Sequence, residues 1–177
     1  VDIALESPTR TKLPPAPLSF ALDHEGGKLF VVSTTDQVYV IDEPTEQIEK
    51  VYNLKGAKGA ISIAYAPEEK LLFVVSQSTD NLQILDATDG KLKADVKVGA
   101  GPLAVVWEPV RKQAYVANRG SDSVAVVDVN GNLVANLPGG SYANHVFTDG
   151  KGTVWSVNKA RGLNDPQGDH ISRYAAK

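Results

Sequence analysis

The sequence repeats four times at intervals of about 40 to 45 residues, and this period limits the possible folds more than any other feature. Each repeat carries an aromatic residue in its second apolar run, and these are Phe30, Phe73, Tyr115 and Trp155. The first three repeats also carry an aspartate after the third apolar run, and these are Asp42, Asp86 and Asp128. A period of this length, with several short strands in each unit, is typical of β-propeller blades.

Each repeat has the pattern of four short strands. In the second repeat we predict the first three at Ile61–Tyr65, Leu71–Val75 and Leu82–Leu85. These runs are rich in Val, Ile, Tyr and Phe and are bounded by Gly, Asp, Asn and Pro, as strands require. They alternate little, which indicates that both faces of each sheet are covered. We therefore predict an all-β fold, a β-propeller of four-stranded antiparallel blades with about four blades in this chain.

The repeat boundaries describe a single partial propeller domain over residues 1–177. We expect the blades to span residues 17–57, 58–100, 101–141 and 142–177, the last with an extended loop. Residues 1–16 are expected to be an outer strand or linker of a preceding blade. The repeated aspartates are predicted to hold turns, because an aspartate carboxylate accepts the N–H group two residues further on.

Composition excludes several kinds of site. Cysteine is absent, which excludes disulfides, cysteine-ligated zinc, iron–sulfur clusters and a cysteine nucleophile in this chain. A clamp that holds a polyanion along the whole chain needs an excess of basic side chains, whereas the formal net charge here is −3. The C-terminal residues 142–177 carry five basic and three acidic side chains, so a small basic patch is still expected there.

The third repeat contains AYVAN at residues 114–118, and weaker copies of this motif are LFVVS at 29–33 and 72–76 and VWSVN at 154–158. Over residues 17–177 the sequence resembles the YncE-like, YVTN-repeat β-propellers, which have WD40-like repeats. The resemblance implies the C-terminal four blades of a seven-bladed ring, exported to the bacterial periplasm or secreted. It also implies a family in which some members bind single-stranded DNA.

Four blades of a larger ring leave the first and last sheets without a neighbour, and monomers seldom expose large apolar patches. The chain also begins at Val1 and contains no methionine. We therefore expect missing N-terminal blades, from the same precursor or a second chain, as the partner. A ring of two copies and a closed four-bladed ring are the alternatives.

In a propeller, the loop before the first strand of each blade and the loop between its second and third strands share one end of the sheets, and such loops commonly carry ligand sites. Cations beside an aromatic ring suit contacts with phosphates and bases of a flexible strand. The predicted binding residues are Asn118, Arg119, Tyr142, Asn144, His145, Asn158, Lys159 and Arg161. The alternative is a solvated rim of turn residues.

No catalytic pattern stands out in the sequence. His24, His145 and His170 fall on different blades without metal-ligand spacing, so we predict neither a metal nor a cofactor in this chain. The glycines of VGAGP and PGGS are predicted to form tight turns, because no P-loop lysine follows them. Trp107 and Trp155 are predicted to pack between blades.

Taken together, these features predict a non-enzymatic binding or scaffold propeller that contacts single-stranded DNA or another anionic ligand. The alternative is an enzyme-type propeller, metal-dependent and lactonase-like or oxidoreductase-associated, whose site is completed by the missing blades. A disc that recruits other proteins is a third class, and the sequence does not separate it from the first.

Overall fold

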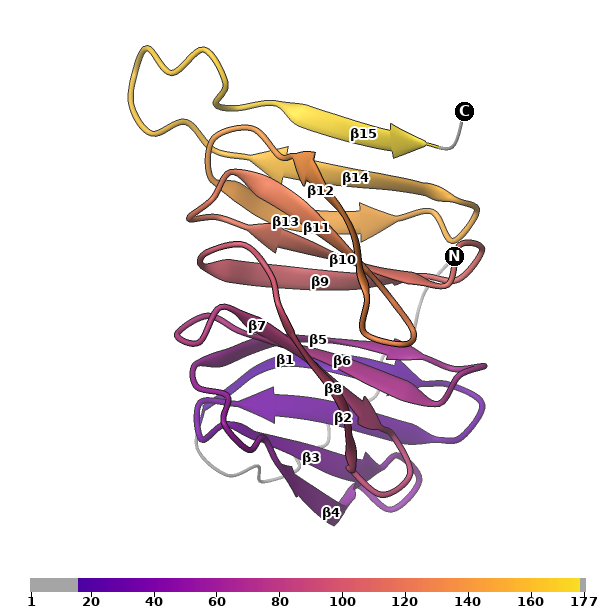
Figure 1. Cartoon of the computed structure of the whole chain (residues 1–177). Coiled ribbons are helices and arrows are strands. Elements are labelled where there is room, and N and C mark those ends of the chain that lie inside the picture. The colour runs from indigo at the N-terminus through magenta and orange to yellow at the C-terminus, as the bar shows by residue number, and fades with distance from the viewer. Residues whose placement is uncertain (1–15, 176–177) are drawn as a thin grey trace, which may run out of the picture.

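The computed structural model describes residues 16–175, and all regular secondary structure in this range is strand. The strands form four antiparallel sheets, as Figure 1 shows. The first sheet contains β1 (Pro17–Asp23), β2 (Lys28–Ser33), β3 (Gln37–Asp42) and β4 (Gln47–Asn53). The second contains β5 (Ala60–Ala66), β6 (Leu71–Ser76), β7 (Asn81–Asp86) and β8 (Leu92–Lys97). The third contains β9 (Pro102–Glu108), β10 (Gln113–Asn118), β11 (Ser123–Asp128) and β12 (Leu133–Pro138), and the fourth contains β13 (Ala143–Thr148), β14 (Thr153–Asn158) and β15 (Ile171–Ala175). These sheets confirm the predicted all-β propeller fold.

The four sheets follow one another in an open arc. Within each sheet the strand order follows the sequence, so every connection is a hairpin. The first strands of successive sheets, β1, β5, β9 and β13, are neighbours in space. Figure 1 shows the first sheet at one end of the stack and the fourth at the other. Within residues 16–175, therefore, the sheets do not close a four-bladed ring.

The fourth sheet departs from the other three. It has three strands in the described part of the chain, and a loop over residues 159–170 separates β14 from β15. The extended loop was predicted for this repeat. The outer strand or linker predicted at residues 1–16 lies almost wholly outside the described residues.

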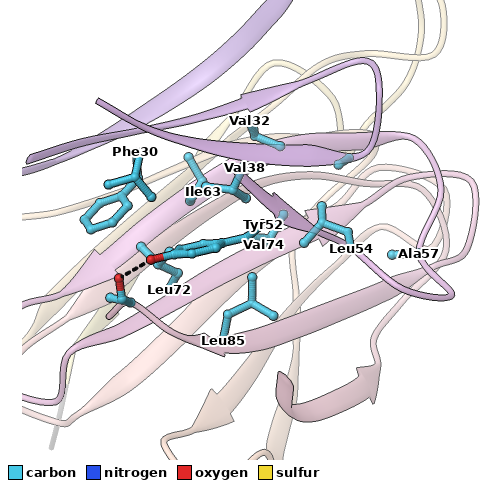
Figure 2. Packing of buried hydrophobic residues seen from close by; sticks show 13 residues of the cluster. Phe30, Val32, Val38, Tyr52, Leu54, Ala57, Ile63, Leu72, Val74 and Leu85 are labelled. Atoms are coloured by element: carbon cyan, nitrogen blue, oxygen red, sulfur yellow. Dashed lines mark hydrogen bonds between the residues drawn. The ribbon is translucent and has the colours of Figure 1, made fainter. Parts of the chain in front are cut away.

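The core lies between successive sheets. Figure 2 shows the first interface, where Phe30 and Val38 of the first sheet meet Ile63 and Leu72 of the second. In the second interface Phe73 stacks on Trp107, with ring centroids 5.1 Å apart and an interplanar angle of 17°. Each interface removes apolar surface from water, which is the main favourable contribution to folding.

The aromatic residue of each second strand faces the following sheet. Phe30 belongs to the cluster between the first and second sheets, Phe73 to the next and Tyr115 to the third. Trp155 occupies the same position in the fourth sheet, where the described chain provides no following sheet. Trp155 is half-buried beside Phe147, whose side chain is 67% exposed. The prediction that Trp107 packs between blades is confirmed. No further sheet lies over Trp155 within residues 16–175, so its packing between blades stays a prediction.

The repeated aspartates hold turns, as predicted. Asp42 accepts hydrogen bonds from the N–H and hydroxyl of Thr45 at 3.1 and 2.7 Å. Asp86 accepts the N–H of Thr88 at 2.9 Å. Asp128 accepts the N–H groups of Asn130 and Asn132, both at 2.9 Å.

Candidate functional site

Two sets of loops meet at one end of the sheets, which we call the loop face. The loops that precede β5, β9 and β13 are bonded to the loops that follow β6, β10 and β14. The Gln77 N–H donates to the Gly59 carbonyl at 2.8 Å, and the Gly120 N–H donates to the Ala100 carbonyl at 2.8 Å. The N–H of Lys159 donates to the Ser141 carbonyl at 3.0 Å. The two sets of loops therefore share one face, as the repeat pattern predicted.

Two of the predicted cations and the predicted aromatic residue come together on the loop face. The guanidinium carbon of Arg119 lies 4.8 Å from the ring centroid of Tyr142, and that of Arg161 lies 4.9 Å from it. Both distances are within the range of cation–π attraction. Arg119 comes from the loop after β10 and Arg161 from the long loop after β14. The site thus joins the third and fourth sheets.

Tyr142 has an unusual backbone conformation, with a φ of 50°. The same loop position in the second and third sheets is held by Gly59 and Gly101, with φ of 72° and 60°. Glycine adopts positive φ without steric cost, whereas a bulky residue there is strained by about 1–3 kcal/mol. In the first sheet the same position is held by Ala16, with a φ of 55°. Tyr142 is therefore the one bulky side chain at this position among the four described sheets.

Asp122 fixes the position of this cluster. Its Oδ1 accepts the N–H of Tyr142 at 2.9 Å, and its Oδ2 pairs with the Arg161 guanidinium at 2.5 Å. Asp36 and Asp80 occupy the same turn position in earlier sheets, where they accept the N–H groups of Ala60 and Gly101. Each of these aspartates thus ties a loop to the loop of the following sheet. Sequence reasoning missed them, although their spacings of 44 and 42 residues follow the repeat.

Asn118 and Asn158, both predicted to contact a ligand, lie below the loop face. The side chain of Asn118 is fully buried and donates to Ser123 Oγ at 3.3 Å. The amide of Asn158 donates to the Gln167 carbonyl and accepts the His170 N–H at 2.6 Å. Both side chains are turned into the protein, so the candidate binding surface is smaller than predicted. Lys159 is exposed beside Asn158.

The other two predicted residues, Asn144 and His145, line a groove along the inner strands. In every sheet the first strand has a register shift that leaves one residue unpaired beside the second strand, and in the fourth sheet this residue is Asn144. Its counterparts in the first three sheets are Leu18, Ile61 and Leu103. A bulge of this kind turns a side chain away from its regular direction. The groove is formed by Leu18, Ser19, Ile61, Ser62, Leu103, Ala104, Asn144 and His145. The bulged residue in this groove is therefore polar in the fourth sheet and apolar in the first three.

The described residues offer no cluster for a metal ion. Within residues 16–175, no three side chains among His, Asp and Glu come together as metal ligands. His24, His145 and His170 are all exposed, in three separate places along the chain. In the glycine loops, Gly101 and Gly140 have φ of 60° and 71°. These two glycines form tight turns, as predicted.

Comparisons with known proteins support the fold. No protein-family model and no curated protein matches the sequence. Among solved structures 1345 chains match, so the arrangement is widespread and says little about function by itself. One is hydrazine synthase of Kuenenia stuttgartiensis, with a TM-score of 0.77 and 19% sequence identity. The match covers 90% of this chain and 47% of that chain, so this chain spans about half its length. At this identity the likeness shows the β-propeller fold alone.

Proposed function

We propose that this chain is a non-enzymatic binding module whose loop face binds an anionic ligand, with single-stranded DNA as the ligand that the sequence resemblance suggests. The observation that carries the proposal is the strained Tyr142 ring with two guanidinium groups over it. Arginine forms bidentate hydrogen bonds with phosphate, and the Tyr142 ring holds the two guanidinium groups together by cation–π attraction. A periplasmic or secreted location belongs to the same proposal and rests on the resemblance. No helix within residues 16–175 is long and apolar enough to cross a membrane.

The two arginines have different parts in this proposal. Arg161 is already paired with Asp122, and a salt bridge at this exposure contributes about 0–1 kcal/mol. Arg119 is exposed and has no acidic partner among the described residues. We infer that Arg119 and Lys159 meet the ligand first, while Asp122 holds Arg161 and Tyr142 in place.

The proposal is tested with a fluorescently labelled oligonucleotide and anisotropy at several salt concentrations. Arg119→Glu is expected to weaken binding about tenfold or more and to reduce the salt dependence, because phosphate contacts release counterions. Lys151→Glu is the matched control, since Lys151 is exposed in the turn between β13 and β14 at the opposite end of the sheet. Equal binding by Arg119→Glu and the unaltered chain, with the same salt slope, would overturn the proposal.

We also propose that the outer face of the fourth sheet is covered by a further blade, from the same precursor or a second chain. Phe147 and Ile171 are 67% and 71% exposed on this sheet, and Trp155 stands where the earlier aromatic residues face the next sheet. A blade of the same repeat would bury these side chains as the second sheet buries Phe30. A seven-bladed ring is the arrangement that the resemblance suggests.

A further inference from the structure

The outer face of the fourth sheet carries a charged residue at a position where the other sheets are apolar. In each sheet the aromatic residue of the second strand pairs with one residue of the third strand. These residues are Val40, Ile84 and Val126 in the first three sheets and Arg173 in the fourth. The three aliphatic residues are buried in the clusters between successive sheets, whereas Arg173 is exposed. The fourth sheet therefore lacks the fully apolar surface that the other three present to their neighbours.

The first strand of the fourth sheet differs in the same region. The first-strand residues that pair with the aromatic residues are Ala21, Ala64 and Val106 in the first three sheets and Phe147 in the fourth. The rings of Phe147 and Trp155 lie with their centroids 6.4 Å apart. In the second interface, by contrast, the ring partner of Phe73 is Trp107 of the following sheet. The fourth sheet thus supplies its own ring partner, and the element that covers it meets a different surface.

No carboxylate shares this face with Arg173 in the described strands. The side chains on the same face of β13, β14 and β15 are His145, Phe147, Trp155, Val157 and Ile171. The Arg173 side chain forms no ion pair or hydrogen bond with the described residues. A guanidinium group that is covered loses its hydration, and this loss is recovered only if acceptors replace the water. A carboxylate is the best such acceptor, because it forms two parallel hydrogen bonds with arginine.

Asp169 indicates how a covering blade is oriented. It ends the loop before β15 with a φ of 56°, and Asp36, Asp80 and Asp122 end the corresponding loops with φ of 55°, 52° and 53°. Those three aspartates accept N–H groups from the first loop of the following sheet. Asp169 is exposed, and among the described residues its carboxylate accepts the Ala160 N–H of its own loop at 3.0 Å. An acceptor is therefore present where a blade in the same orientation would place its first loop.

We propose that the further blade over the fourth sheet presents a carboxylate to Arg173. This inference rests on the further blade proposed above and names the chemistry by which that partner is recognised. Arg173 takes the position of Val40, whose cluster includes Leu72 and Leu85 on the second and third strands of the following sheet. The carboxylate is therefore expected on the second or third strand of the partner blade, at the position of Leu72 or of Leu85.

A second copy of this chain does not fit this description. In a ring of two copies, the fourth sheet of one copy would meet the first sheet of the other. The side chains clustered on that face of the first sheet are Leu29, Val31, Tyr39 and Ile41, and none of them is acidic. The ring of two copies would therefore cover Arg173 without a carboxylate.

The test adds a blade to the full chain. A copy of residues 58–100 is joined to the C-terminus, either unaltered or with Leu72→Glu or Leu85→Glu in the copy. The copy contains no tryptophan and Trp107 is buried, so acrylamide quenching of fluorescence reports mainly on Trp155. One of the two glutamate copies is expected to lower the quenching constant about twofold or more relative to the unaltered copy, because a buried charge needs its partner.

Arg173→Leu is the matched variant, because it restores an aliphatic residue at this position. In that background the unaltered copy is expected to protect Trp155 better than either glutamate copy, so the order reverses. The four combinations form a double-mutant cycle, which isolates the interaction between the two positions. Lys151→Leu removes the same charge from an exposed turn of the fourth sheet and is expected to leave the preference for glutamate unchanged.

The outcomes separate this inference from the proposal on which it rests. Equal protection of Trp155 by all copies when Arg173 is present would overturn the carboxylate and leave the further blade in place. Quenching that no copy changes would overturn both. Protection of Trp155 by a short oligothymidylate, in the chain without an added blade, would assign this face to a nucleic acid and contradict the inference.

Discussion

The carboxylate of Asp80 accepts the N–H of Gly101 at 2.8 Å, and this bond joins the turn after β6 to the loop that begins the third sheet. Asp36 and Asp122 make the same kind of bond at the neighbouring boundaries. Asp80 itself has a φ of 52°, a conformation that aspartate tolerates better than most residues. One residue thus supplies both a turn conformation and a contact between sheets.

We expect Asp80→Ala to lower the free energy of unfolding by about 1–3 kcal/mol, because the Gly101 N–H loses its acceptor and alanine is less suited to positive φ. Urea denaturation measures the effect. Glu43→Ala, on an exposed turn of the first sheet, is the control and should stay within about 0.5 kcal/mol. Equal changes in the two variants would show that the bond between sheets contributes nothing to stability.

The two tryptophans provide a second prediction. Trp107 is buried against Phe73, so Trp107→Ala should cost about 3–5 kcal/mol. Trp155 has no sheet over it in the described chain, so Trp155→Ala should cost about 1 kcal/mol in the isolated monomer. Chemical denaturation of both variants at low protein concentration compares them. A similar large loss for Trp155→Ala would mean that something already covers the outer face of the fourth sheet.

The exposed face of the fourth sheet should promote association when no further blade covers it. Phe147→Glu places a charge in this face and is expected to reduce concentration-dependent self-association in sedimentation velocity. Val110→Glu is the control, because Val110 is 65% exposed in a turn of the third sheet, away from that face. The prediction fails if the unaltered chain and both variants sediment as the same monomer at every concentration.

The repeat in the sequence was sufficient to predict the fold, because strand number, turn aspartates and apolar runs all recur with one period. It also identified Arg119, Tyr142 and Arg161, since equivalent loops of adjacent sheets must converge. The environment of a single side chain was harder to predict. Asn118 and Asn158 end their strands with side chains that point into the protein, and this direction depends on the register of the strands. Trp155 has no sheet over it in the described residues, and its burial depends on which sheets are present.

The turns between the first and second strands of the sheets show a further limit. The turn of the first sheet has Gly26 at the position of Arg111 in the third, and the Arg111 side chain reaches the fourth sheet. An alignment of the repeats shows the difference in residue type. It does not show that Arg111 reaches across to Gly152, because that contact requires the relative position of two sheets.

Acid should weaken the fold partly through Asp86. Hydrogen bonds from the hydroxyl and N–H of Thr88 lower the pKa of Asp86 to about 2, against an unfolded value near 3.9. Between about pH 4 and pH 2 the unfolded chain therefore binds more protons at this site, so its contribution to stability is present above pH 4 and is lost on acidification. Asp86→Asn should flatten this part of the curve of unfolding free energy against pH, measured by urea denaturation at each pH. Identical curves for Asp86→Asn and the unaltered chain would contradict the assignment.

Tyr142→Gly separates binding from folding at the loop face. Glycine occupies the equivalent position in two other sheets, so this variant should fold and keep or gain up to about 1 kcal/mol in the free energy of unfolding as the strain at φ 50° is released. It should nevertheless bind the oligonucleotide less tightly, because Arg119 and Arg161 lose the ring that orients them. Tyr142→Phe keeps the ring and should bind normally. Lys70→Gly, at φ 52° in the turn between β5 and β6, shows the effect of releasing strain elsewhere. A variant that is less stable by more than about 1 kcal/mol, or that binds unchanged, would mean that the ring of Tyr142 serves packing rather than the ligand.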